Sequence, residues 1–423
     1  MIPLPLRPPG SETGADTPRR RTPAEMIQEG SLYVLLLLLP FSKAAIEILF
    51  GFLFIGWLVA RLDPRTRRDS LWLRSSLRPL AFAIMGYLAA CALSIVVSSA
   101  PWLSLKGFFG KWVEYLLLFV IMADLGHRTG VWKRSLAVLT VSSLLVFMEA
   151  MTQLRFGRGL LRHYPLMMYG RVTGPYENPI DLATYLMVVL LCLLICPWRN
   201  SAGRALRWAT LGALLWLIAA TDAHGAWLAF CIGLIAMMSV VPSFRRQGFV
   251  VLLAALAAAA AALCASGHLK EALSWSEAGK MDRWMMWQAA LGMIRDRPWL
   301  GHGVNTFMDN YLRYRVGGEL WPRYAHNCYL QVAAETGVVG LAWFLGLLGA
   351  LFTRLSKGLG RLEPERGLLL LGVFGGLVAF VVQSAYDTNF YAMRQAALFW
   401  VLAGLAVGLS ERPQSMGSAG GQP

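Results

Sequence analysis

The sequence is poor in charge, which excludes an ordinary soluble protein. Only 15% of its 423 residues are charged, whereas 57% are hydrophobic. Apolar runs too long for a soluble core recur along the whole chain, so we expect an all-α, polytopic integral membrane protein. Residues 1–30 show no cleavable signal, because they are rich in proline and carry Arg19, Arg20 and Arg21 before the first apolar run. We expect a disordered cytoplasmic tail there.

The sequence also lacks the cysteine pattern of a metal or disulfide framework. Five of its six cysteines lie inside apolar runs, where a small buried hydrophobic residue is the default interpretation. Cys192 and Cys196 are one helical turn apart, but no histidine or acidic residue accompanies them as a further ligand. We therefore expect no metal site, no disulfide and no cofactor.

Twelve apolar segments predict twelve transmembrane helices. They cover residues 31–41, 45–61, 78–98, 106–124, 132–154, 179–196, 205–221, 225–241, 248–266, 327–352, 366–385 and 392–410. We assign residues 31–410 to one transmembrane domain. Within it, residues 267–326 form a large helical outer loop between the ninth and tenth helices. Residues 411–423 form a second disordered tail.

The distribution of Lys and Arg predicts the orientation of the helices. If the N-terminus is cytoplasmic, every inner loop is basic, whereas the outer loops at 99–105, 222–224 and 386–391 contain no Lys or Arg. Both termini are then cytoplasmic. Much of the net charge of +15 is thus a topological signal, and we expect no nucleic-acid partner.

Two outer loops, residues 155–178 and 267–325, are basic against this trend. Binding of an anion is the natural reason, and contact with anionic lipid headgroups is the alternative. The second loop looks structured: we expect an interfacial helix over residues 282–295, a turn at 301–303 and a second helix over about 306–314. These helices would cap the outer ends of the transmembrane helices.

The stretch after this loop places His326 and Asn327 at the start of an apolar helix. The positive end of the helix dipole favours the neutral imidazole that a general base requires. A loop histidine that only caps the helix is the alternative. Gly337 and Gly340 fall on the face below His326, where we expect another helix to approach closely.

On this topology, polar residues crowd the outer side, and five of the six histidines are among them. This density predicts a hydrated cavity there. Asp222 and Asp387 are either helix caps or side chains that orient Arg283 or His326. Glu335 points away from His326 on its helix and needs a partner or a proton.

Two lysines near the outer side lie one helical turn before a glutamate. Lys111 and Glu114 are three residues apart, and Lys43 and Glu47 are four apart. We expect a structural ion pair in each case.

With these features the sequence resembles the O-antigen ligase and polymerase family of bacterial envelope glycosyltransferases. Three stretches carry the resemblance, and together with the loop position they cover nearly the whole transmembrane region. They are His326-Asn327 followed by Gly337-Val-Val-Gly340; Asp282-Arg283-Trp284 leading to Arg297-Pro-Trp-Leu-Gly-His-Gly303; and Gly170-Arg171-Val-Thr-Gly174-Pro-Tyr-Glu-Asn178-Pro179.

The resemblance implies a metal-independent, inverting glycosyltransferase of the GT-C kind in the bacterial inner membrane, with its site facing the periplasm. The donor would be a glycan on undecaprenyl diphosphate, and the acceptor a sugar hydroxyl of lipid A-core, with membrane lipids around the protein. His326 and Arg283 would be catalytic, as base and as counter-charge of the leaving diphosphate. The implied substrate-binding residues are Arg171, His224, Asn327, Asn178, Arg323 and Asp222.

One stretch departs from the family pattern. Members carry a Ser-Arg step at the start of the eighth span, whereas this chain has Asp222-Ala223-His224. Either Asp222 favours a protonated His224, or Arg171 supplies the second diphosphate clamp.

Other functions remain open at this point. A polymerase extending the glycan on its own carrier needs the same chemistry, and a protein O-oligosaccharyltransferase differs only in the acceptor. A transporter would also have twelve helices, but the sequence has no internal repeat and few charges at mid-membrane. A non-catalytic scaffold would follow if His224 marked a degenerate site.

Overall fold

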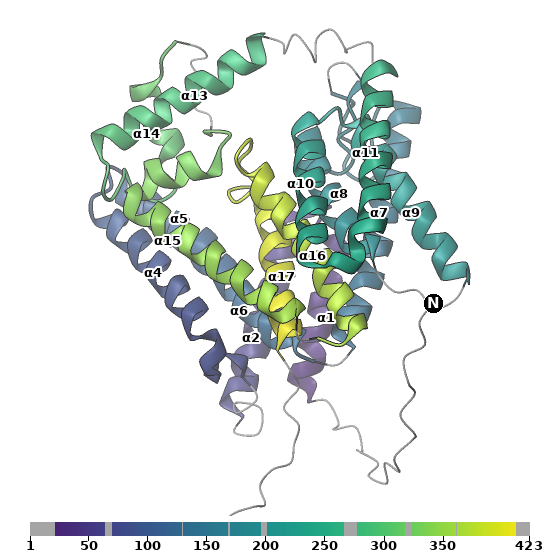
Figure 1. Cartoon of the computed structure of the whole chain (residues 1–423). Coiled ribbons are helices and arrows are strands. Elements are labelled where there is room, and N and C mark those ends of the chain that lie inside the picture. The colour runs from purple at the N-terminus through teal and green to yellow at the C-terminus, as the bar shows by residue number, and fades with distance from the viewer. Residues whose placement is uncertain are drawn as a thin grey trace, which may run out of the picture.

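The protein is helical throughout the part of the chain that the structure describes. The computed structural model describes residues 22–63, 70–128, 130–167, 170–195, 201–265, 277–317, 324–360 and 362–411. Apart from two isolated β-bridges, the regular elements in these ranges are helices (Figure 1). The predicted all-α class is therefore confirmed.

Each of the twelve predicted segments lies on a helix, or on several joined end to end. The first half contains α1 (Pro23–Leu38), α2 (Lys43–Leu62), α4 (Arg78–Val96), α5 (Pro101–Gly107), the π-helix η3 (Phe108–Val113), α6 (Glu114–Gly126) and α7 (Val131–Phe156). The second half contains α8 (Pro179–Leu194), α9 (Ser201–Ala220), α10 (His224–Val240), α11 (Arg245–Ala265), α13 (Glu277–Asp296), α14 (Phe307–Tyr314), α15 (Cys328–Leu359), α16 (Pro364–Gln383) and α17 (Met393–Ser410).

Six helices of the described residues are long and apolar enough to cross a membrane: α2, α4 with the turn before it, α7, α15, α16 and α17. The apolar helices α8 and α10 and residues 248–257 of α11 are shorter. The chain is thus a membrane-embedded helical protein. Crossing by all twelve segments, and their orientation, stay predictions.

The first helix begins earlier than the sequence pattern indicated. Thr22 accepts a hydrogen bond from the backbone N–H of Glu25, and the Glu25 carboxylate accepts one from Thr22, which is a capping box. Helix α1 therefore starts at Pro23, and residues 23–30, predicted to be part of a disordered tail, are helical. Glu25 and Glu29 also pair with Arg128 and Arg134, contacts that no local pattern could indicate.

Helix α17 lies at the centre of the bundle, against α6 (Figure 1). All its residues from Arg394 to Ser410 are buried. Glycines allow the close contact: a Cβ at Gly404 would lie 2.4 Å from the Phe119 carbonyl oxygen, and one at Gly408 would lie 2.2 Å from that of Ala123. This tight pair fixes the segments before and after α17, which lie at opposite ends of the molecule.

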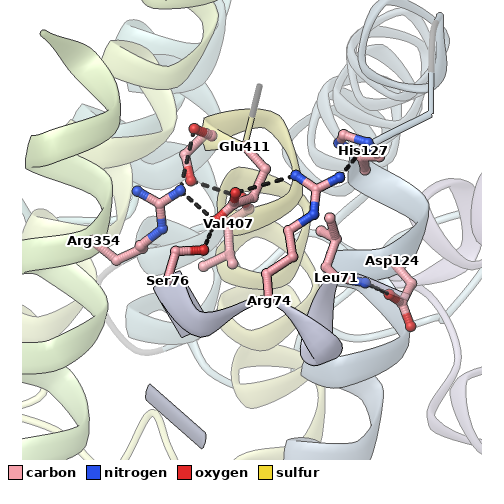
Figure 2. Close-up of polar contacts among 9 residues, drawn as sticks. Leu71, Arg74, Ser76, Asp124, His127, Arg354, Val407 and Glu411 are labelled. Carbon is pink, nitrogen blue, oxygen red and sulfur yellow. Dashed lines mark hydrogen bonds and ion pairs between the residues drawn. The ribbon is translucent and has the colours of Figure 1, made fainter. Parts of the chain in front are cut away.

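An ionic network closes the end of the bundle where α17 finishes. Figure 2 shows Arg74 and Arg354 on either side of Glu411. Arg74 lies 3.3 Å from the Glu411 carboxylate, Ser76 donates to it at 2.9 Å, and the other side of Arg74 meets the ring of His127. The two arginines thus share one carboxylate, whose side chain is only 8% exposed.

We expect Glu411→Gln to destabilise the fold, because it removes the negative charge that two largely buried arginines share. Breaking a buried ion pair by removing one partner costs about 3 kcal/mol or more. The free energy of unfolding in detergent, measured by denaturant titration, should fall by that amount. The matched control is Glu363→Gln, which changes an exposed glutamate beside α16.

The same network makes the stabilisation by Glu411 depend on pH. Burial alone would raise the pKa of Glu411, but Arg354, with Ser76 and Arg74, holds this pKa below its ordinary value of 4.5. The stabilisation is therefore complete above pH 4.5 and disappears as the pH falls through the folded-state pKa. An unchanged stability of Glu411→Gln at pH 7 would show that the network adds nothing.

Candidate active site

His326 and Asp387 form a pair at the end of the bundle opposite the ionic network. His326 precedes α15, with a backbone φ of +48°, and its Nδ1 lies 3.2 Å from Oδ1 of Asp387. Asp387 is buried, whereas the His326 side chain is 27% exposed. With the proton on Nδ1, the imidazole donates to Asp387 and keeps Nε2 free to accept a proton. Of the two predicted roles of Asp387, the structure supports the orienting one.

The outer loop caps this end as expected. Helices α13 and α14 confirm the two predicted helices, and both contact α15 (Figure 1). Met286, Met293, Phe307 and Ala325 belong to one buried cluster that joins the cap to the segment before His326. The cap therefore holds the chain that delivers His326.

The kink of α15 brings together two of the stretches that carry the resemblance, residues 297–303 and 337–340. Gly337 has φ +68° and ψ −176°, which interrupts the helix. The turn before α14 lies against this kink and is joined to it by four backbone hydrogen bonds. Val338 donates to Pro298 at 2.7 Å, Val339 to Trp299 at 3.4 Å, His302 to Ala334 at 3.0 Å and Gly303 to Glu335 at 2.8 Å.

The expectation that another helix approaches Gly337 is therefore wrong. A Cβ at Gly337 would lie 2.1 Å from the Trp299 carbonyl oxygen, so the partner is the turn. A Cβ at Gly340 would meet the side chain of Thr336, from the same helix. The helical-wheel argument failed because α15 is not a regular helix at this point.

A basic cluster forms a second part of the site. Arg171 donates to the carbonyl oxygens of Thr221 at 3.0 Å and Asp222 at 3.4 Å. His224 Nε2 lies 3.5 Å from Asp222 Oδ1. The structure thus brings Arg171, Asp222 and His224 together, and both predicted explanations of the departure from the family pattern stay predictions.

The charge of Arg283 on α13 acts on Arg171 of this cluster. Burial lowers the pKa of Arg171 from its ordinary value, the Asp222 carboxylate opposes that effect, and the charge of Arg283 adds to it. Two positive groups that repel each other are suited to share an anion.

The two parts of the site meet through α16. A Cβ at Gly225, next to His224, would lie 3.2 Å from the Gln383 side chain at the end of α16. Four residues later the chain reaches Asp387. The basic cluster and the His326–Asp387 pair therefore lie at the same end of α10 and α16.

The two predicted asparagines act as helix caps. The Asn178 side chain accepts from the backbone N–H of Ile180, and that of Asn327 accepts from Tyr329 and Leu330. Contact of either with substrate stays a prediction. Arg323 lies outside the described residues.

Both predicted lysine pairs are wrong. Lys111 donates to Asn305 at 2.7 Å, and Lys43 pairs with Glu177 at 3.1 Å. Lys111 belongs to the π-helix η3, where hydrogen bonds run from i to i+5, so residues three apart do not stack as in an α-helix. Among the described residues no group of three or more His, Cys, Asp or Glu side chains could hold a metal ion.

The fold and this site define a membrane-embedded helical protein whose His326–Asp387 pair and basic cluster lie at one end of the bundle. Residues 209–345 match the family model described as O-antigen ligase. The family resemblance is thereby confirmed, and two of its three sequence stretches lie inside the match, whereas the stretch at 170–179 lies outside it. The match supports membrane glycosyltransferase-like activity of the ligase or polymerase type. The matched segment includes His224, Arg283 and His326 but not Arg171 or Asp387. No curated protein matches the chain.

Proposed function

We propose that this protein is an O-antigen ligase. It transfers a glycan from undecaprenyl diphosphate to a sugar hydroxyl of lipid A-core, on the periplasmic face of the bacterial inner membrane. The observation that carries the proposal is the His326–Asp387 pair, 3.2 Å apart, at the same end of the bundle as a cluster of positive side chains. A base for a hydroxyl and a counter-charge for a diphosphate are the two groups that this transfer needs.

In the proposed step the acceptor hydroxyl oxygen attacks the anomeric carbon of the glycan from the side opposite the diphosphate. The new C–O bond forms as the bond from the anomeric carbon to the phosphate oxygen breaks, which inverts the configuration. Nε2 of His326 takes the hydroxyl proton, and the buried carboxylate of Asp387 stabilises the resulting imidazolium. The products are glycosylated lipid A-core and undecaprenyl diphosphate.

Arg283 and Arg171 take the negative charge that grows on the leaving diphosphate. Arginines bind phosphate oxygens bidentately and stay charged when partly buried, which suits both residues. His224 beside Asp222 adds a third group to the same cluster. In this proposal Arg171 compensates for the departure from the family pattern, since it reaches in from the preceding loop and holds the chain just before His224.

Lipopolysaccharide gels of a host deleted for this gene test the proposal. We expect the deletion to leave bare core while long glycan accumulates on the polyprenyl carrier, and wild type to restore the ladder. Arg283→Ala should lower ligation about a hundredfold, because it removes a preorganised group that stabilises charge in the transition state. Arg295→Ala, an exposed arginine on the same helix, is the matched control and should restore the ladder.

Three outcomes would contradict the proposal or part of it. Core bearing a single repeat unit in the deleted strain would identify a polymerase. A normal ladder in the deleted strain, or full activity of Arg283→Ala, would contradict the proposed function or the proposed role of Arg283.

A further inference from the structure

Glu335 is a buried carboxylate that the proposed chemistry does not use. Its side chain has no exposed surface, and it accepts four hydrogen bonds. Backbone N–H groups of Asn305 and Phe307 donate at 2.7 and 3.3 Å, Gln331 donates at 3.2 Å, and the Tyr391 hydroxyl donates at 3.0 Å. Its donors thus come from the turn before α14, from α14, from α15 itself and from the segment before α17.

One of these bonds leads to His326. Gln331 donates to Glu335 with its amide nitrogen and accepts from the backbone N–H of Ala325 with its amide oxygen, at 3.3 Å. Ala325 is the residue before His326, whose positive φ is a conformation that non-glycine residues rarely adopt. The Glu335–Gln331 link therefore fixes the backbone one residue before a strained position that has to be held by its surroundings.

Another bond leads to Asp387. Tyr391 lies four residues after Asp387 in the segment between α16 and α17, and its backbone N–H donates to Thr388, the neighbour of Asp387. The hydroxyl of Tyr391 donates to Glu335. The same carboxylate thus anchors the segments that carry both members of the pair.

A positive charge balances this carboxylate. Lys111 of the π-helix η3 interacts electrostatically with Glu335, donates to Asn305 at 2.7 Å, and lies 5.4 Å from the ring centre of Tyr391. A π-helical turn is a local departure from regular structure that often marks a functional site. Here it carries a lysine that meets two of the groups bound to Glu335.

We infer that Glu335 is a positioning residue for the catalytic pair: it holds the segments of His326 and Asp387 in register so that their 3.2 Å contact is kept. The inference rests on the proposed function, in which His326 is the base. It also explains why a carboxylate is needed, because four donors converge on its two oxygens. A glutamine there would replace one of these oxygens by an NH₂ group, which would point its own N–H at a donor and could accept no hydrogen bond from it.

The test measures how fast the imidazole of His326 reacts with a chemical label. The full-length protein in detergent is treated with diethyl pyrocarbonate, and the modification of each histidine is quantified by peptide mass spectrometry. Loss of a buried hydrogen bond to a charged group loosens what it holds, so His326 of Glu335→Gln should react about tenfold faster than in wild type. Tyr391→Phe, which removes a single hydroxyl, should give a smaller increase. His127, at the opposite end of the molecule, reports whether the fold is kept.

A matched control comes from a second buried carboxylate. Glu149 accepts hydrogen bonds from the backbone N–H groups of Leu160, Leu161 and Arg162, and these bonds hold the loop after α7 rather than the pair. Glu149→Gln should leave the His326 rate unchanged. If Glu335→Gln also raises the labelling rate of His127, that variant has unfolded. The labelling rate of His326 in Tyr391→Phe then tests the inference. Wild-type His326 rates in every variant that keeps His127 protected would overturn the inference.

Kinetics separate positioning from a merely structural role. Glu335→Gln should lower kcat with KM unchanged, and it should cause no further loss when combined with His326→Ala, since it acts through that residue. Additive losses would overturn the inference. The labelling needs no substrate, so a failure of the proposed ligation in the gel assay would leave the labelling result interpretable.

Discussion

The His326→Ala variant should lose glycan transfer by a factor of about 10²–10⁴, the range that a positioned general base contributes. Alanine removes Nε2, the group that in the proposed function takes the proton from the acceptor hydroxyl. It leaves the basic cluster of Arg171, Asp222 and His224 in place, because none of the contacts within that cluster involves His326. The loss should therefore appear in kcat, with donor binding kept.

The measurement is transfer by purified protein in nanodiscs, with lipid-linked glycan as donor and lipid A-core as acceptor. His163→Ala is the matched control, since His163 is also a histidine with positive φ, +54°, but it is exposed in the loop after α7. Its rate should equal that of wild type. This comparison separates the chemistry of the imidazole from any effect of placing alanine at a strained position.

Asp387→Asn gives a second comparison. An asparagine keeps the size of the side chain but no longer stabilises the imidazolium, so transfer should fall by an intermediate amount. Equal rates of His326→Ala and wild type would remove His326 from the chemistry and leave it as a residue that precedes a helix cap.

The hydrophobic pattern predicted the helices because apolar runs of this length have few other solutions in a membrane. It also predicted α13 and α14, since Pro298 and the glycines that follow it interrupt an otherwise helical pattern. His326, Arg283 and Arg171 could be selected as ionisable groups at the ends of apolar segments. Each of these three residues could be selected from the sequence immediately around it.

The rest of the site depends on contacts between distant segments. Asp387 follows His326 by 61 residues, and nothing local distinguishes its orienting role from a cap. Lys111 was assigned to the wrong partner because a π-helical turn has no clear sequence signature and changes which residues are neighbours. Asn305, which binds Lys111 and donates to Glu335, was not selected at all. Its positive φ of +61° is visible only in the structure.

Two of the three stretches that carried the family resemblance turn out to be one structural unit. The turn around Trp299 and the kink at Gly337 are joined by backbone hydrogen bonds, and Glu335 lies between them. Glycines at 301, 303 and 337 all have positive φ, and a Cβ at Gly301 would lie 2.4 Å from the backbone of Glu335. The turn and the kink therefore depend on each other, because the backbone of each packs directly against that of the other.

Gly337→Ala should accordingly destabilise the protein by more than about 3 kcal/mol. A φ of +68° with a ψ of −176° is accessible essentially only to glycine, and a Cβ would lie 2.1 Å from the Trp299 carbonyl oxygen. Either the kink or the turn has to move, and both are attached to Glu335. The variant should therefore lose transfer activity even where enough protein remains folded.

The control lies on the same helix. A Cβ added at Gly349 of α15 would meet no neighbouring atom within 4 Å, so Gly349→Ala should keep wild-type stability and activity. Denaturant titration in detergent, followed by a transfer assay on the folded fraction, measures both quantities. If Gly337→Ala proved as stable and active as Gly349→Ala, the kink would be incidental. The close fit between turn and helix could then not be what holds Glu335, and through it His326, in place.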